Sequence, residues 1–535
     1  MSGLENRDFT GGGRVRAPAG WRFENSYLRL PAALYERCLP VPVRSPGIAV
    51  FNRKLAEDLG LDRGILETDV GAAFLSGNRI PEGAEPIAQA YAGHQFGHFT
   101  MLGDGRAILL GEHLAPGGAR WDIQLKGSGT TPFSRRGDGR ATFGPMLREF
   151  VISEAMHALG IPTTRSLAVV TTGETVFREE PLPGAVLTRV AASHIRVGTF
   201  EYAAAQGDDA LLRALSEYTL RRHFPECADP ADPAARLLEC VIRRQASLLA
   251  RWMLVGFVHG VMNTDNMALS GETIDFGPCA FLDAYDPSTV FSSIDAHGRY
   301  AYANQPDIAH WNLARLAESL LPLLDPKPDH AIGRARELLD IFPAAFRQHR
   351  MDGLQKKIGL IAHEPGDEAL AEDLLAEMAR HGMDFTNTFR NLRAKPGNGP
   401  TDNPALQGWL TRWRDRLLAQ PPASTSAKSA DDADHRTVGV PPASSESGQD
   451  ARAPGNLRPP TAEAQALMQQ NNPAIIPRNH LVEEALDAAV TNGDLSRLHA
   501  LLLALESPYA DAPGRTGFLD PPPPGTAPYR TFCGT

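Results

Sequence analysis

The segment from His259 to Gly277, which reads HGVMNTDNMALSGETIDFG, constrains this chain more than any other. It places Asn266 and Asp275 nine residues apart across a short turn, with Asp265 beside the asparagine. Amide and carboxylate oxygens at this spacing can face one divalent cation and supply the hard ligands that Mg²⁺ and Mn²⁺ prefer. A simple polar turn would explain the polarity but not the His-Gly and Asp-Phe-Gly that frame it. The segment therefore predicts a metal site formed by Asn266 and Asp275.

The same segment is similar to two loops of protein kinases. In those enzymes an H-R-D-x-x-x-x-N loop supplies a catalytic Asp and a metal-binding Asn, and a later D-F-G supplies a second metal ligand. This chain keeps the His, the Asn and the D-F-G, but Val261 occupies the place of the catalytic Asp. Valine cannot accept a proton, so Asp265 is the candidate general base. Either the chain has lost phosphoryl transfer, or it performs a related reaction with a relocated base.

The composition limits the classes of binding partner and the cellular compartment that this chain is suited to. The formal net charge of −10 argues against nucleic acid or an anionic membrane as the main partner. The five cysteines are scattered and form no CxxC pair, which excludes a zinc site of paired cysteines and suits a reducing compartment. The first residues contain no apolar run, and no apolar stretch approaches the length of a membrane span. We therefore expect a cytoplasmic protein.

The pattern along the chain predicts an α+β protein with a bilobal, protein-kinase-like layout. We expect a β-rich nucleotide-binding lobe over residues 87–203 and a helical lobe with the catalytic and metal loops over residues 204–418. Four further regions are expected: a mobile tail (1–20), an N-terminal extension packed on the core (21–86), a disordered insertion rich in Pro, Ser and Ala (419–462), and a C-terminal helical segment with an extended tail (463–535).

Three elements of the β-rich lobe bear on function. Alternating apolar residues predict a strand over residues 120–126, and an apolar stripe predicts a helix over residues 142–159. Further along, SLAVVTTGETVF predicts two strands about a glycine turn, and AVLTRVA predicts another strand.

Lys126 stands at the end of the first of these strands, where a kinase places the lysine that holds nucleotide phosphates. Alone, a lysine at a strand end is more often a solvent-facing residue. The helix downstream changes this balance because it offers Glu149 as an ion-pair partner, with Glu154 as the competing candidate. We therefore predict a phosphate-binding lysine.

Two glycine-rich loops are candidates for binding phosphate. Gly103, Gly105 and Arg106 precede the lysine strand, but their spacing is not G-x-G-x-x-G and a hairpin turn explains them equally well. The second loop, KGSGTTPFSRRGDGRATFG, concentrates arginines between a strand and a helix, with Asp138 and Gly139 at its centre. Such a concentration of charge favours an anion-binding loop over a merely solvated one.

His94 and His98 are four residues apart, a spacing that suits a metal ion on a helix. Gly93 and Gly97 make a helix unfavourable there, and no third ligand is close in sequence. Packed, hydrogen-bonded histidines are therefore the favoured interpretation, as is a structural role for His259.

Together these segments resemble the selenoprotein O family, kinase-like proteins that are also described as protein nucleotidyltransferases and include bacterial members of the YdiU type. The resemblance runs from about Trp21 and is carried by the long strings YAGHQFGHF, LGDGRAILLGE, DIQLKGSGTTPFSRRGDGRATFGPMLREF, VLTRVAASHIRVGTFEY, GVMNTDNMALSGETIDFGPCAFLD and NNPAIIPRNHLVEEAL.

The resemblance implies a kinase fold that binds ATP in an inverted orientation and transfers AMP to Ser, Thr or Tyr hydroxyls of proteins. For some members it implies UMP transfer from UTP with Mn²⁺. The implied roles are a general base (Asp265), Mg²⁺ or Mn²⁺ ligands (Asn266, Asp275), a phosphate-binding lysine with its ion-pair partner (Lys126, Glu149), terminal-phosphate contacts (Arg189, Arg196) and further residues lining the nucleotide site (Gly103, Gly105, Arg106, Asp138, Gly139).

The resemblance also implies a cysteine near the C-terminus, and Cys533 fits. In some relatives this residue forms a regulatory disulfide with a cysteine after the metal loop, but the expected place, around Phe291, holds none, and Cys279 is the nearest candidate. Two other functions stay open at this point. One is an ordinary phosphotransferase that uses Asp265 as its base, and the other is a non-catalytic nucleotide-binding scaffold with a redox-active tail.

Overall fold

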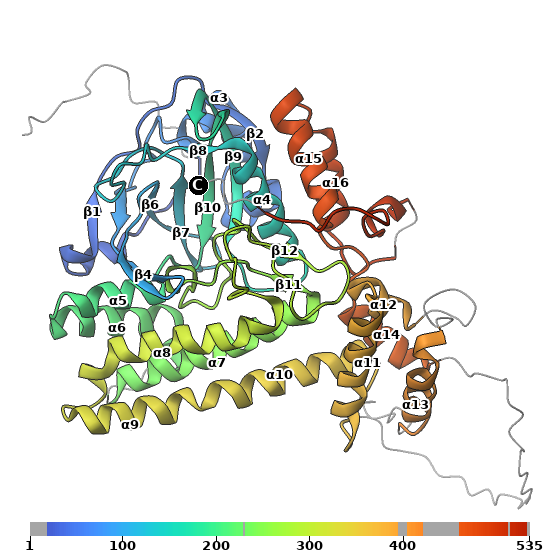
Figure 1. The fold of residues 1–535 in the computed structure, drawn as a ribbon. Coiled ribbons are helices and arrows are strands. Elements are labelled where there is room, and N and C mark those ends of the chain that lie inside the picture. The colour runs from blue at the N-terminus through green and yellow to red at the C-terminus, as the bar shows by residue number, and fades with distance from the viewer. Residues whose placement is uncertain (1–18, 228–230, 394–403, 421–459, 512–513, 532–535) are drawn as a thin grey trace, which may run out of the picture.

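The computed structural model describes residues 19–227, 231–393, 404–420, 460–511 and 514–531. Nearly all of the predicted N-terminal tail and of the predicted disordered insertion lie outside these residues, as does Cys533. The described chain is a mixed α/β protein with one large, mainly antiparallel sheet in its N-terminal part and helices through most of the remainder (Figure 1). None of its helices combines the length and the apolar character that crossing a membrane requires.

The large sheet has eight strands. Seven of them run in the order β1 (Tyr35–Arg37), β3 (Ile87–Gln89), β6 (Ala107–Leu114), β7 (Arg120–Lys126), β10 (Pro181–Ala191), β9 (Arg165–Phe177) and β2 (Gly47–Phe51), and β8 (Ala141–Thr142) pairs with β10. The predicted lysine strand is β7, and its last residue, Lys126, lies opposite Leu187 of β10 and Ala107 of β6.

One predicted feature of this sheet is wrong. The stretch SLAVVTTGETVF does not form two strands about a glycine turn, because β9 continues through Gly173 to Phe177 and turns only at residues 178–180. Gly173 has a φ of 67°, and the register of β9 with β10 shifts beside it. A glycine in the left-handed region here accommodates an irregularity within one strand and does not end it.

Helices cover both faces of the sheet because successive strand residues point to opposite sides. On one face, Leu109 and Val169 join the cluster of α4 (Phe143–Ala158), the helix expected over residues 142–159. On the other face, their neighbours Leu110 and Val170 pack with α1 (Arg53–Leu59). The short helices α2 (Arg63–Leu66) and α3 (Asp69–Leu75) follow α1.

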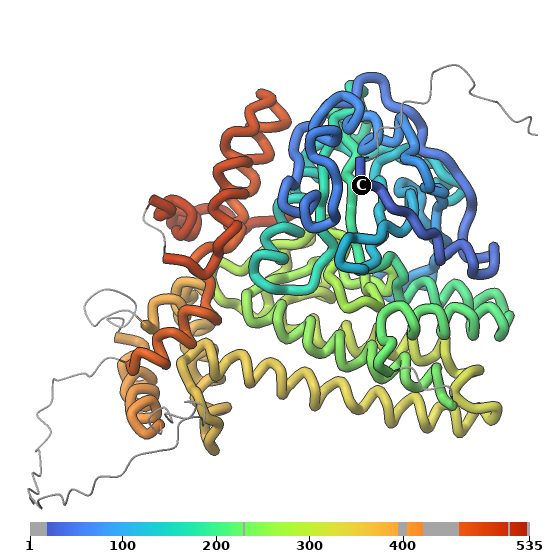
Figure 2. The backbone as a smooth tube through the Cα atoms, turned by 180° about the vertical axis from the view of Figure 1, so that it is seen from behind, coloured from blue at the N-terminus to red at the C-terminus, as the bar shows by residue number. Residues whose placement is uncertain are grey.

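Below the sheet lies a layer of helices (Figures 1 and 2). It contains α5 (Val197–Ala205), α6 (Asp209–His223), α7 (Pro233–Val255), α8 (Gln305–Leu324), α9 (Pro328–Leu339) and α10 (Ile341–Lys357). At the far end of α10 is a second group of helices, α11 (Asp367–His381), α12 (Phe385–Asn391), α13 (Gln407–Leu418) and α14 (Ala462–Asn471). The last two helices, α15 (Asn479–Asn492) and α16 (Ser496–Leu505), return to lie beside α4.

Two small sheets connect the large sheet with the helical layer. The hairpin of β4 (Ala92–Gln95) and β5 (His98–Met101) extends toward α5, and β11 (Phe257–Val258) pairs with β12 (Ala280–Phe281). The segment between β11 and β12 carries the predicted catalytic and metal loops. The fold therefore brings the metal loop, the lysine strand and the β4–β5 hairpin to one place.

Candidate active site

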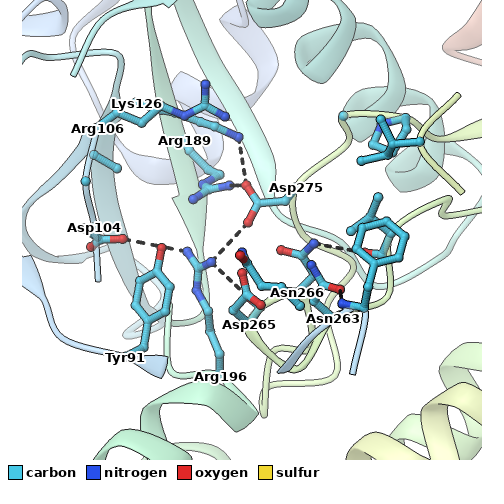
Figure 3. Close-up of a pocket in the computed structure, with 18 residues that line it drawn as sticks. Tyr91, Asp104, Arg106, Lys126, Arg189, Arg196, Asn263, Asp265, Asn266 and Asp275 are labelled. Carbon is cyan, nitrogen blue, oxygen red and sulfur yellow. Dashed lines mark hydrogen bonds and ion pairs between the residues drawn. The ribbon is translucent and has the colours of Figure 1, made fainter. Parts of the chain in front are cut away.

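A pocket of about 420 Å³ lies where the large sheet meets the loops above the helical layer (Figure 3). Its walls come from five parts of the chain: the β4–β5 region, the strands β6, β7 and β10, the start of α5, the loops between β11 and β12, and the segment after β12 at Ile294. The charged residues that line it are Asp104, Arg106, Lys126, Arg189, Arg196, Asp265 and Asp275. Most of the residues predicted from the sequence to form the site therefore meet in one cavity.

Asp275 is the centre of this charge cluster (Figure 3). Its Oδ1 atom accepts hydrogen bonds from Lys126 Nζ at 2.8 Å and from an Arg189 guanidinium nitrogen at 2.6 Å, and its Oδ2 atom accepts one from Arg196 at 3.1 Å. Burial by itself raises the pKa of Asp275, but these three cations outweigh burial and hold that pKa well below its usual value. Asp275 is also one of three non-glycine residues of the described chain with a positive φ, 63°. The carboxylate is therefore ionised and held in a strained backbone position.

Lys126 also contacts the helix that the sequence analysis assigned to it. Its Nζ atom lies 2.5 Å from Glu149 Oε2 of α4, and the other carboxylate oxygen of Glu149 accepts from Arg189 at 3.1 Å. The competing candidate, Glu154, is occupied elsewhere because it pairs with Arg165 of β9 at 2.5 Å. The structure thus pairs Lys126 with Glu149, and both groups are buried.

Arg196 connects the pocket to two residues that sequence reasoning missed. Its guanidinium lies over the ring of Tyr91, 4.6 Å from the centroid, and 3.9 Å from the carboxylate of Asp104. Burial raises the pKa of Asp104 to about 6, although the charge of Arg196 opposes this shift. Both missed residues belong to strings that were quoted for the family resemblance, and an aspartate between two glycines, in LGDGR, is the signal that would have identified Asp104.

Asp265 also lines the pocket. Burial raises the pKa of its carboxyl group to about 6, although the positive charge of Arg196 lowers it. Its Oδ1 atom is buried and has no hydrogen-bond partner within the described chain. The Cα atom of Gly93 in β4 is so close that a Cβ atom added there would lie 2.3 Å from this oxygen. A carboxyl group of raised pKa that lines the pocket is suited to accept a proton from a bound group.

The loop that carries Asp265 is held by the β4–β5 hairpin. The backbone amide of His94 donates to the Thr264 hydroxyl at 2.7 Å, and that hydroxyl donates to Glu201 of α5 at 2.6 Å. His94 Nδ1 lies 2.5 Å from the other carboxylate oxygen of Glu201. His94 is therefore a packed, hydrogen-bonded histidine, which agrees with the favoured interpretation, and His98 lies exposed on β5.

Asn266 and Asp275 carry oxygen atoms of the kind that a divalent cation takes as ligands, and in the present structure those of Asp275 accept from Lys126, Arg189 and Arg196. The side-chain amide nitrogen of Asn266 donates to the Val261 carbonyl at 2.9 Å, which leaves its Oδ1 atom for other contacts. Within the described residues, no group of three or more His, Cys, Asp or Glu side chains is arranged to hold a metal ion. Two protein oxygens fit a cation that takes its remaining ligands from phosphate and water, as Mg²⁺ commonly does. The residues present therefore fit the metal that the sequence predicted.

The glycine-rich loops divide between the pocket and its surroundings. Gly105 and Arg106 line the pocket, whereas Gly103 packs against the ring of Phe133. Asp138 and Gly139 are not brought into the pocket. Asp138 forms an ion pair with Arg178 at 2.9 Å, and Gly139 closes against the backbone at Gly129 and Thr130. Asp138 and Gly139, at the centre of the arginine-rich loop, therefore contact other residues of the β-rich region and do not line the pocket.

The C-terminal tail returns to the segment that follows the metal loop. The Thr531 amide donates to the carbonyl of Phe291 at 2.8 Å, and its hydroxyl donates to the carbonyl of Pro278 at 3.0 Å. Pro278 precedes the buried Cys279. The sequence favours a free thiol at Cys533, and because that residue lies outside the described residues, the structure does not test this expectation.

Comparisons with known proteins identify the family of this chain. The family model described as protein adenylyltransferase SelO matches residues 20–506. Two relatives named protein nucleotidyltransferase YdiU, from Geobacillus kaustophilus and Syntrophotalea carbinolica, are 55% and 54% identical to this chain. The alignments cover 97% and 96% of this chain and 100% and 98% of the respective relatives. A third relative of the same name, from Bacillus cytotoxicus, is 53% identical over 97% of this chain and 99% of its own length. The chain therefore belongs to the SelO family.

Proposed function

We propose that this protein transfers AMP from ATP to Ser, Thr or Tyr hydroxyls of other proteins and releases pyrophosphate. The description of the family model and the names of the relatives support the transfer of a nucleotidyl group. The observation that carries the proposal is the arrangement of charge in the pocket. Three cationic side chains converge on Asp275, and the carboxylate of raised pKa in the pocket belongs to Asp265 instead of residue 261.

The fold that surrounds this pocket supports a protein-kinase-like, bilobal organisation. An antiparallel sheet with α4 packed on one face precedes a helical layer, and the pocket lies between the sheet and that layer. Lys126 on a strand and Glu149 on that helix form the ion pair that protein kinases use to hold nucleotide phosphates. We assign the nucleotide-binding lobe to residues 87–203 and the catalytic lobe to residues 204–418, with the flanking regions as additions.

The inverted nucleotide is the part of the proposal that separates AMP transfer from phosphorylation. For AMP transfer, the α-phosphorus must face the incoming hydroxyl, with pyrophosphate leaving opposite to it. Arg189 and Arg196 would bind the terminal phosphate in this orientation, and Arg106 and Gly105 would line the same cavity. Guanidinium groups suit this role because each can contact a phosphate through two parallel hydrogen bonds.

Asn266 and Asp275 would hold Mg²⁺ or Mn²⁺ against the phosphates. When bound, the cation supplies charge neutralisation for the departing pyrophosphate. Lys126 and the two arginines, which share Asp275 in the present structure, add to that neutralisation once phosphate oxygens replace the carboxylate as their partner. The buried setting of these groups strengthens each interaction, because little water screens them.

Asp265 would act as the general base. Its carboxylate takes the proton from the acceptor hydroxyl while the hydroxyl oxygen forms a bond to the α-phosphorus. The bond between that phosphorus and the bridging oxygen of the β-phosphate breaks, and its electron pair leaves with pyrophosphate. A pKa of about 6 suits this step, because the group is ionised at neutral pH and is still basic enough to accept a proton.

The test is incubation of the full chain and an acceptor protein with ATP labelled either at the α-phosphate or at the γ-phosphate. We expect covalent label on protein only from the α-labelled nucleotide, dependent on Mg²⁺ or Mn²⁺, and lost in Asp265→Asn and Asp275→Asn. Label from the γ-position alone would refute AMP transfer and support a phosphotransferase. Parallel reactions with UTP and Mn²⁺ measure whether UMP is also transferred.

A further inference from the structure

The β4–β5 hairpin forms a rim of the pocket. Gln95 and Phe96, at its tip, line the pocket, and Asp104 lines it just beyond the end of β5. β5 therefore lies between two residues that line the pocket, Phe96 before the strand and Asp104 after it. The inner strand, β4, contacts the catalytic loop through the hydrogen bonds of His94 with Thr264. A polypeptide that enters the pocket can therefore contact the tip of this hairpin.

This rim carries exposed apolar side chains. Phe99 and Met101 of β5 are 47% and 44% exposed, and Ile294, which also lines the pocket, is 55% exposed. Phe99 and Met101 are two residues apart on one strand, so they share a face. Large apolar side chains gathered at the edge of a polar, charged pocket are typical of a site that contacts a partner.

The outer edge of β5 has no strand partner among the described residues, although one of its backbone groups, the Met101 carbonyl, accepts a hydrogen bond from Arg135. Within the described chain, β5 pairs with β4 alone, and the two strands form a separate small sheet. An edge strand of this kind presents backbone N–H and C=O groups that an extended peptide can pair with. Pairing of that type gives affinity through the backbone, and side-chain contacts on alternate positions give selectivity.

Positive charge lies beside this edge. The guanidinium of Arg135 donates to the carbonyl of Met101 at the end of β5, and both Arg135 and Arg136 are exposed. At the opposite end of the hairpin, Arg299 lies near Gly97, about 3.9 Å from the position of an added Cβ atom. An acidic side chain on a peptide that follows β5 would therefore meet a cation at either end.

We propose that the acceptor polypeptide docks on this rim as an extended strand along the free edge of β5. Apolar side chains of the acceptor contact Phe99 and Met101, and an acidic side chain faces Arg135. The acceptor leaves β5 near His98, crosses Ile294 and places its hydroxyl in the pocket beside Asp265. This inference rests on the proposed function and adds to it the surface and the chemistry by which an acceptor is recognised.

The experiment uses the full chain, α-labelled ATP, Mg²⁺ and a library of Ser-centred peptides with degenerate flanking positions. We expect labelled peptides to be enriched in apolar residues at alternate positions on one side of the Ser and in an acidic residue further along. In Arg135→Glu we expect the acidic preference to change to a basic one. Methylation of alternate backbone nitrogens in a selected peptide is expected to raise its KM at least tenfold, because it removes donors from the strand pairing.

Phe99→Ser and Met101→Ser test the apolar contacts. Each is expected to raise the KM for the selected peptide at least tenfold and to leave ATP binding, measured separately by calorimetry, unchanged. The matched control is Phe177→Ser, because Phe177 is 73% exposed on the β9–β10 hairpin and does not line the pocket. It should leave the KM unchanged.

The outcomes separate the two proposals. If the parent chain labels peptides and Phe99→Ser, Met101→Ser and Arg135→Glu leave KM and sequence preference unchanged, docking on the rim is refuted and AMP transfer stands. If the parent chain binds ATP and labels no peptide and no protein, the proposed function fails and the docking surface fails with it. A fall in ATP affinity in the rim variants would also refute docking, because it would show that the rim acts on the nucleotide.

Discussion

Gly93→Ala is the sharpest test of the role assigned to Asp265. The φ of Gly93 is not in the left-handed region, so alanine is compatible with the backbone. The added Cβ atom would lie 2.3 Å from Oδ1 and 2.8 Å from Cγ of Asp265, whereas ordinary contacts begin at 3.4 Å. The carboxylate must therefore move by about 1 Å, a displacement that typically costs about 100-fold in rate.

A loss of about 100-fold corresponds to about 2.7 kcal/mol in the activation free energy. We expect this loss in kcat for AMP transfer at saturating ATP and acceptor, with ATP affinity unchanged, because the substitution contacts the base and not the arginines. The control is Gly117→Ala, since an added Cβ at that exposed glycine meets no atom within 4 Å. It should retain the kcat of the parent.

The double variant Gly93→Ala with Asp265→Asn shows whether Gly93→Ala lowers kcat through the Asp265 carboxylate. If the glycine acts only through the carboxylate, the double variant is no slower than Asp265→Asn alone. A folded Gly93→Ala protein with a kcat within about twofold of the parent would refute the positioning argument. A strictly additive loss in the double variant would show that Gly93 acts elsewhere.

Three further predictions concern other parts of the molecule. Lys126→Met should lower kcat for AMP transfer by about 100-fold or more, because a phosphate contact is lost, and should leave the protein folded by circular dichroism, because Arg189 still neutralises Glu149. Burial lowers the pKa of His223 to about 3 from an ordinary value of 6.5, so the unfolded chain takes up a proton first and the free energy of unfolding falls as the pH falls below 6.5. The fall from this residue is about 2 kcal/mol at pH 5, and urea titrations should find it missing in His223→Gln. Tyr529→Phe removes the hydroxyl that joins the C-terminal tail to Arg148 of α4 at 2.6 Å and should lower the free energy of unfolding in urea by about 1 kcal/mol; an unchanged midpoint would contradict this contact.

Local patterns in the sequence predicted much of this protein. The helix over residues 142–159 appears as α4, and the lysine strand appears as β7, because amphipathic periodicity is a local property of the chain. Asn266 and Asp275 were predicted from a local pattern as well, and both line the pocket, while the metal site that they would form stays a prediction. The membership of the SelO family, predicted from the resemblance of long strings, is confirmed by the comparisons.

Other features depended on contacts between distant segments. The sequence left Glu149 and Glu154 as alternative partners of Lys126. The two residues are five positions apart on one helix and therefore lie on different faces of it. Arg165 of β9 forms an ion pair with Glu154, so Glu149 is the residue that pairs with Lys126. The strand break predicted at Gly173 was likewise wrong, because pairing with β10 continues past the glycine. A local signal for a turn is weak against a long ladder of backbone hydrogen bonds.

The pocket itself was decided by tertiary structure. Tyr91 and Asp104 were missed because they reach Arg196 only when the β4–β5 region folds against the start of α5, about a hundred residues later in the chain. Asp138 was expected in the pocket but forms an ion pair with Arg178, because its own loop packs beside the β9–β10 hairpin. The sequence thus specified which chemical groups are available, and the packing of the sheet on the helical layer determined which of them share one buried space. Burial in that space is also what sets the pKa of Asp265, a property that no residue pattern carries by itself.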